Sequence, residues 1–173
     1  EDKDPHTQYI AMHFNSKPSP TVISRCKNKF GFNRLAYIDW VIDNERFLDF
    51  AFVLMDKVFK LTQDNTKALI YIGTNKAISK FYEFLISVYP QYKYQIGIYT
   101  SIIPDSEKEE QLDKRIILST TKSCGAAMDI HGLKVTVVLA EPFRSEVLAR
   151  QTLGRTRASN TFYIDCIDDG FFY

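Results

Sequence analysis

Three arginines lie close together near the end of the chain, in residues 149–158 (ARQTLGRTRA), where Arg150, Arg155 and Arg157 lie on either side of Gly154. Guanidinium groups are planar, permanently charged, and match phosphate oxygens with two parallel hydrogen bonds. Positive charge of this kind stabilises the equatorial oxygens during phosphoryl transfer. The cluster is therefore a candidate for contact with a nucleotide.

The arginine cluster also has a structural interpretation. A basic helix end can pair with nearby carboxylates, such as Glu141 or Glu146, and can interact favourably with the helix dipole. The cluster by itself leaves these two interpretations open.

Two further polar segments follow apolar runs. Gly73, Thr74 and Asn75 come directly after residues 68–72 (ALIYI). Glycine allows a close backbone approach, and the hydroxyl, the amide and the N–H groups of a helix start can hold a phosphate. The alternative for this turn is a plain cap on the following helix.

The second polar segment is residues 119–129 (STTKSCGAAMD), which contains Thr120, Thr121, Lys122 and Asp129. Small residues let a backbone lie against a polyanion, and successive N–H groups form a concavity that binds anions. The alternative is a polar loop in which Asp129 caps a turn.

The apolar runs predict the elements that position these turns. Strands are expected over residues 68–72, 94–99, 115–119, 135–140 and 161–167, with helices over 76–88, 105–112 and 145–152. Alternating strands and helices indicate right-handed crossovers and a mostly parallel sheet covered by helices on both faces. Ligands of such sheets bind at the carboxyl ends of the strands, which is where the polar turns fall.

The first part of the chain is expected to serve as scaffold. Residues 8–14 alternate as a strand, which Pro18 and Pro20 then interrupt. Residues 33–61 have helical spacing, with Asn44 as an N-cap between two helices. We expect their apolar side chains to face the core: Leu35, Ile38, Val41, Ile42, Phe47, Leu48, Ala51, Leu54, Met55, Val58 and Phe59.

Composition narrows the possible functions. The 173 residues are 45% apolar, and 22 Lys and Arg against 21 Asp and Glu give a net charge of +1, so any binding of a polyanion depends on local charge. The three cysteines show no CxxC spacing, which favours a reducing intracellular compartment and predicts no metal site. No apolar run is long enough to span a bilayer. The sequence contains no GxxxxGK[ST] phosphate loop and no paired nucleophile and base.

Taken in order, three segments resemble the second RecA-like domain of superfamily 2 helicases. ALIYIGTNK (68–76) resembles motif IV, ILSTTKSCGAAMDI (117–130) resembles motif V, and QTLGRTR (151–157) resembles motif VI, QxxGRxxR. The resemblance covers residues 67–168 and implies a three-layer α/β fold. Residues 1–66 resemble the leading strand and helices of viral and phage-type members, so residues 1–66 and 67–173 are expected to form one domain of a larger protein.

The resemblance implies roles at an ATP site shared with a first motor domain. Arg155 matches an arginine finger. The second finger would fall at Ala158, so Arg157, one residue earlier, is its candidate. Gln151 and Gly154 would help to form the ATP site. The list of ATP-binding candidates is completed by Asp129, although Ala127 replaces the usual glycine before it.

The resemblance further implies that Gly73, Thr74, Asn75, Thr120, Thr121 and Lys122 contact the backbone of a nucleic-acid strand, DNA being preferred to RNA. ATP and Mg²⁺ would be bound mainly by the first motor domain. The expected activity is that of an ATP-dependent helicase, and this chain by itself would be inactive. A viral member would act in the host cytoplasm or nucleus, in replication. The alternative is a non-catalytic RecA-like module that binds nucleic acid or a protein.

Overall fold

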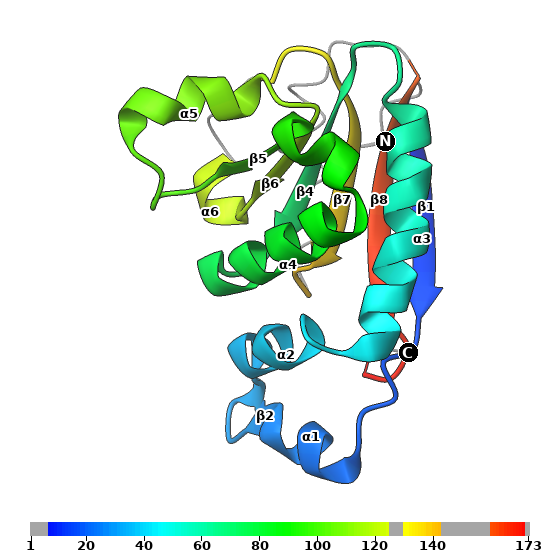
Figure 1. The fold of residues 1–173 in the computed structure, drawn as a ribbon. Coiled ribbons are helices and arrows are strands. Elements are labelled where there is room, and N and C mark those ends of the chain that lie inside the picture. Colours follow the sequence, from blue (N-terminus) through cyan, green and yellow to red (C-terminus); the bar gives the residue numbers. More distant parts are fainter. Residues whose placement is uncertain (1–6, 125–129, 143–159, 172–173) are drawn as a thin grey trace.

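The computed structural model describes residues 7–124, 130–142 and 160–171. Its centre is a six-stranded sheet in the order β1-β8-β7-β4-β6-β5, and every described pairing within this sheet is parallel (Figure 1). This confirms the predicted α/β class with a parallel sheet. The strands are β1 Thr7–Phe14, β4 Lys67–Ile72, β5 Ile96–Tyr99, β6 Ile116–Ser119, β7 Leu133–Ala140 and β8 Thr161–Asp168.

Helices α3 (Glu45–Leu61) and α4 (Asn75–Val88) cover the near face of the sheet in Figure 1. Side chains of a strand alternate between the two faces, so Ile70 and Ile72 of β4 pack into the core beneath these helices. Leu69 and Tyr71 belong to a second buried cluster. Both faces of β4 are therefore buried, as its continuous apolar run predicts. The helix expected over residues 145–152 lies outside the described residues.

The helical region predicted over residues 33–61 forms two helices, each of which begins after an asparagine. Helix α2 (Arg34–Val41) is capped by Asn33, and α3 is capped by Asn44, whose Oδ1 accepts a hydrogen bond of 2.9 Å from the amide of Phe47. These side chains satisfy amide groups that have no partner within the helix. The expected N-cap at Asn44 is confirmed.

Strand β1 joins the edge of the sheet beside β8, with Thr7 opposite Thr161 and Phe14 opposite Asp168. The buried Asp168 carboxylate accepts hydrogen bonds from the Ser16 hydroxyl at 2.5 Å and from the Tyr37 hydroxyl at 3.0 Å. Burial, followed by the Asp168 charge, raises the pKa of Tyr37 far above its usual value. The leading segment is thus fastened to the last strand. The division of the chain at residue 66 stays a prediction.

Two expectations for this scaffold are wrong. Tyr94 and Gln95 were expected in a strand, but they end the 3₁₀ helix η1 (Pro90–Gln95), and β5 begins at Ile96. Pro90 opens this helix, because its fixed φ suits a first helical position. Leu35 was expected to face the core, but it is 58% exposed in the first turn of α2.

Most of the remaining short elements lie at the carboxyl ends of the strands. Helix α1 (Pro20–Arg25), the antiparallel pair β2 (Lys27–Asn28) and β3 (Gly31–Phe32), and α2 lie below the strand tips in Figure 1. Helix α5 (Asp105–Leu112) connects β5 to β6, and α6 (Thr121–Cys124) follows β6 directly. Helix α5 returns to the amino ends of the strands, where the Leu112 carbonyl accepts a hydrogen bond of 2.8 Å from Nζ of Lys67, and the other elements lie at the predicted ligand edge.

Candidate phosphate-binding site

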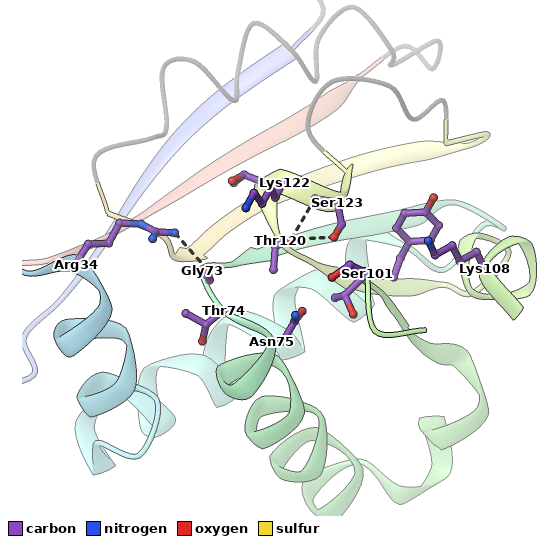
Figure 2. Close-up of a pocket in the computed structure, with 12 residues that line it drawn as sticks. Arg34, Gly73, Thr74, Asn75, Ser101, Lys108, Thr120, Lys122 and Ser123 are labelled. Atoms are coloured by element: carbon purple, nitrogen blue, oxygen red, sulfur yellow. Dashed lines mark hydrogen bonds between the residues drawn. The ribbon is translucent and has the colours of Figure 1, made fainter. Parts of the chain in front are cut away.

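A cavity of about 570 Å³ lies at the carboxyl ends of β4, β5 and β6 (Figure 2). All six residues predicted to contact a strand line it, although they come from two segments of the chain. The lining consists of Gly73, Thr74 and Asn75 after β4; Tyr99, Thr100 and Ser101 at β5; Thr120, Thr121, Lys122 and Ser123 after β6; Arg34 of α2; and Lys108 of α5. The structure therefore brings the two polar turns together, as expected for adjacent parallel strands.

Gly73 is needed here for packing. A Cβ atom at this position would collide with Cδ1 of Ile38 and would lie 3.0 Å from Nη2 of Arg34. The amide of Gly73 also donates a hydrogen bond of 3.0 Å to the carbonyl of Ala140. The glycine allows α2 to approach the turn closely, a reason that differs from the phosphate approach inferred from the sequence.

Thr74 caps helix α4, because its Oγ1 accepts a hydrogen bond of 3.1 Å from the amide of Ala77. The cap interpretation of this turn is thus confirmed, and it is compatible with ligand binding. The first amides of a helix have no partner within it, and the helix dipole adds positive potential at this end. Helix α4 has 14 residues and begins at Asn75, so the positive end of its dipole lies at the cavity.

Two buried oxygens at the cavity have no hydrogen-bond partner among the described residues. They are Oδ1 of Asn75 and Oγ1 of Thr100. Buried polar atoms are nearly always hydrogen-bonded, so unpartnered atoms beside a cavity indicate a ligand or ordered water. A threonine hydroxyl can donate to an anion, and an asparagine amide offers both a donor and an acceptor.

The charged side chains of the lining are all cationic: Arg34, Lys108 and Lys122. Lys122 is exposed and forms no ion pair or hydrogen bond with the part of the chain that the structure describes. Lys108 lies 3.0 Å from Asp105, a highly exposed carboxylate, and 5.9 Å from the ring centroid of Tyr99. No carboxylate lines the described cavity wall, so the site favours an anion.

Arg34 was not identified from the sequence. Its Nε and Nη2 atoms each lie 2.5 Å from Oε1 of Glu141, and Nη2 donates to the carbonyl of Gly73 at 3.3 Å. Glu141 follows β7 and is buried, and its Oε2 has no partner among the described residues. Glu141, which the sequence offered as a partner for the late arginine cluster, pairs with Arg34. No local signal predicts this contact between residues 107 positions apart.

Two ion pairs connect α4 to α2 and to the segment that follows α2. Lys76 lies 2.9 Å from Asp39, and its hydrogen bond lowers the pKa of that carboxyl group. Lys80 lies 2.6 Å from Asp43, and this hydrogen bond raises the pKa of Lys80. Lys76 therefore faces α2, which explains why the last residue of the GTNK turn does not line the cavity.

The predicted ATP-site residues cannot be placed in this geometry. Asp129, Gln151, Gly154, Arg155 and Arg157 lie outside the described residues. Their roles stay predictions.

Two described thiols and the arrangement of possible metal ligands bear on other kinds of site. Burial raises the pKa of the Cys26 and Cys166 thiols, which keeps them protonated at neutral pH. Among these residues, no three His, Cys, Asp or Glu side chains are grouped to hold a metal ion. None of the described helices is long and apolar enough to cross a membrane.

Comparison with solved structures identifies the fold. The chain is similar to T4 UvsW, with a TM-score of 0.64 and 10% identity over 95% of this chain and 33% of that protein. It is also similar to domain 2 of the DEAD-box helicase Mss116p bound to an RNA duplex, with a TM-score of 0.58 and 14% identity over 94% of this chain and 54% of that one. A third similar structure is S. cerevisiae Dbp5 bound to RNA and ADP BeF3, with a TM-score of 0.59 and 14% identity over 96% of this chain and 37% of that one. No family model and no curated protein matches the sequence.

These matches define the class of domain. The chain has a RecA-like fold and is structurally similar to domain 2 of the DEAD-box helicase Mss116p. It spans from a third to about half of the length of the proteins that it matches. Their identities of 10 to 14% establish the fold, whereas activity and ligands must be argued from the residues of this chain.

Proposed function

We propose that this chain is the second motor domain of an ATP-dependent helicase or translocase and that it holds a nucleic-acid strand at the carboxyl edge of its sheet. The observation that carries the proposal is the cavity lining. Residues from motif IV and from motif V, chosen from the sequence as strand contacts, line one cationic cavity in a helicase-like fold.

The binding chemistry follows from the side chains. Lys122 provides a charge that no described carboxylate neutralises, and the hydroxyls of Thr120 and Thr121 can donate to phosphate oxygens. The start of α4 adds amide donors next to Asn75. Because these groups recognise the sugar-phosphate backbone, we expect little sequence preference. The related structures of Mss116p and Dbp5 contain RNA, and a preference of this chain for DNA stays a prediction.

The second part of the proposal concerns ATP, which together with Mg²⁺ would be held mainly by a first motor domain. Arg155 would extend its guanidinium group toward the terminal phosphate and neutralise charge during hydrolysis. Arg157 would supply the second finger in place of Ala158. Gln151 and Asp129 would orient the nucleotide-facing side of the cleft. Closure and reopening of the cleft would then alternate the hold on the strand.

A second candidate is a non-catalytic RecA-like module that binds nucleic acid or a protein. Two features favour it: the sequence has no GxxxxGK[ST] loop, and Ala158 replaces the expected arginine. The encoded sequence upstream decides between the candidates. A phosphate loop and a DExx box within about 200 residues, roughly one domain, would support the motor.

The test of the motor assignment is the ATPase activity of the full-length protein stimulated by single-stranded nucleic acid. We expect Arg155→Ala to lower turnover by about 10³- to 10⁵-fold, the range for arginine fingers, while strand binding is retained. Arg150→Ala is the matched control, since Arg150 falls outside the finger positions of the motif. Near-normal turnover in Arg155→Ala would contradict the proposal. A large loss in Arg157→Ala would identify that residue as the second finger.

A further inference from the structure

The β2–β3 hairpin presents an aromatic side chain to solvent. Phe30 lies in its turn and is 87% exposed, and Nζ of Lys29 lies 5.0 Å from its ring centroid. Because so much of its surface is exposed, this ring is available for contact with a partner.

The hairpin is held in a defined shape. The amide of Phe30 donates a hydrogen bond of 2.8 Å to Oδ1 of Asn28, which fixes the turn. At the base, the amide of Asn33 donates to the carbonyl of Cys26 at 2.7 Å, and Cys26 is buried. The exposed ring is thus carried on an anchored support and does not depend on core packing.

The surroundings of the ring in the sequence are strongly basic. No Asp or Glu occurs between Asp4 and Asp39, whereas this stretch contains Lys17, Arg25, Lys27, Lys29 and Arg34. The chain as a whole has a net charge of only +1, so positive charge is concentrated in this segment. Such a segment favours a polyanionic partner.

The hairpin is next to the proposed strand site. Asn33 separates β3 from Arg34, which begins α2 and lines the cavity. Arg34 follows Phe30 by four positions, a span of at most about 14 Å when the chain is fully extended. In Figure 1 the hairpin lies beyond the strand tips, at the same edge of the sheet as α2.

We propose that Phe30 stacks on a base of the nucleic-acid strand whose backbone lies in the cavity, while Lys27 and Lys29 contact adjoining phosphates. This inference rests on the proposed function. Aromatic rings with neighbouring cations bind single strands without sequence preference, because every base has a π-face. A protein partner fits less well, since the centres of protein interfaces are depleted of lysine.

The experiment measures binding of fluorescein-labelled oligothymidylate by fluorescence anisotropy at low salt. We expect Phe30→Ala to weaken binding about 5- to 150-fold, as for the loss of one stacked base, and Phe30→Trp to restore it. Tyr94→Ala is a matched control: Tyr94 is 82% exposed, with Lys93 5.8 Å from its ring, but precedes β5 at the opposite edge of the sheet. This variant should bind like the unmodified chain.

A cross-link provides a second measurement. A strand that contains 5-iodouridine should cross-link to the hairpin peptide on near-ultraviolet irradiation and lose that product in Phe30→Ala. If the unmodified chain does not bind the strand, the proposed function itself fails. If the chain binds and Phe30→Ala binds equally well, the hairpin assignment is overturned while the cavity assignment stands. A loss of affinity that Phe30→Trp does not restore would also overturn stacking.

Discussion

The two edges of the sheet use their cations differently. At the amino edge, Arg115 donates from Nε to the Thr62 hydroxyl at 3.0 Å, from Nη1 to Gln95 Oε1 at 3.1 Å and from Nη2 to the Phe59 carbonyl at 2.5 Å. Its guanidinium carbon lies 5.1 Å and 5.3 Å from the ring centroids of Phe59 and Tyr92. This side chain is fully used by the fold.

At the carboxyl edge Arg34 pairs with Glu141 and Lys108 with Asp105, but other groups are left available. Lys122 has no partner among the described residues, and the buried oxygens of Asn75 and Thr100 are likewise unpartnered there. Leaving buried polar atoms unpaired costs stability. We therefore expect a bound ligand to supply hydrogen-bond partners for Asn75 and Thr100. Arg115 is therefore a structural residue, whereas the carboxyl-edge cavity has groups available to bind a ligand.

The largest expected effect that would sharpen this contrast is at the amino edge. Arg115→Ala removes three hydrogen bonds and two aromatic contacts, and we expect the free energy of unfolding to fall by about 3 kcal/mol. Urea denaturation measures this loss. Oligothymidylate binding by the folded variant should be unchanged at low temperature. A loss of binding without a loss of stability would break the division between the two edges.

A smaller effect is expected at the cap of α4. Thr74→Ala removes the bond to the Ala77 amide, and we expect it to lower the free energy of unfolding by about 1 kcal/mol and to weaken strand binding. The reason is that the cap positions the helix start that faces the cavity. Urea denaturation and anisotropy, measured on the same samples, give the two values.

The matched control for Thr74 is Asn44, which caps α3 by the same type of bond to the amide of Phe47 and does not line the cavity. Asn44→Ala should lower stability at least as much, because Asn44 also donates to the Ser16 carbonyl, and should leave binding intact. An equal loss of binding in both variants would assign the effect of Thr74→Ala to general destabilisation.

The sequence predicted well those parts of the fold that depend on local patterns. The continuous apolar run of residues 68–72 indicated a strand buried on both faces, and Asn44 indicated a helix start; both are confirmed. The two polar turns could be assigned to one edge because parallel strands end at the same side of a sheet. Their meeting in one cavity followed from topology.

Contacts between distant segments could not be predicted in this way. Nothing near Arg34 indicates that it would reach Glu141 and the carbonyl of Gly73, because that contact depends on the position of α2 at the carboxyl edge of the sheet. The apolar spacing around Leu35 suggested a buried side chain, but the spacing does not show that this side chain points to solvent in the folded chain. Local pattern sets each element, and tertiary packing decides which side chains meet.

The most direct test of the central claim is the salt dependence of oligothymidylate binding by Lys122→Ala. We predict weaker binding and a reduction of about 0.7 in the slope of log K against log salt, the value for one lost phosphate contact on a single strand. Lys93→Ala, which removes an exposed lysine before β5, should keep both the affinity and the slope. An unchanged slope in Lys122→Ala, or an equal change in Lys93→Ala, would contradict the assignment of the carboxyl-edge cavity to the nucleic-acid backbone.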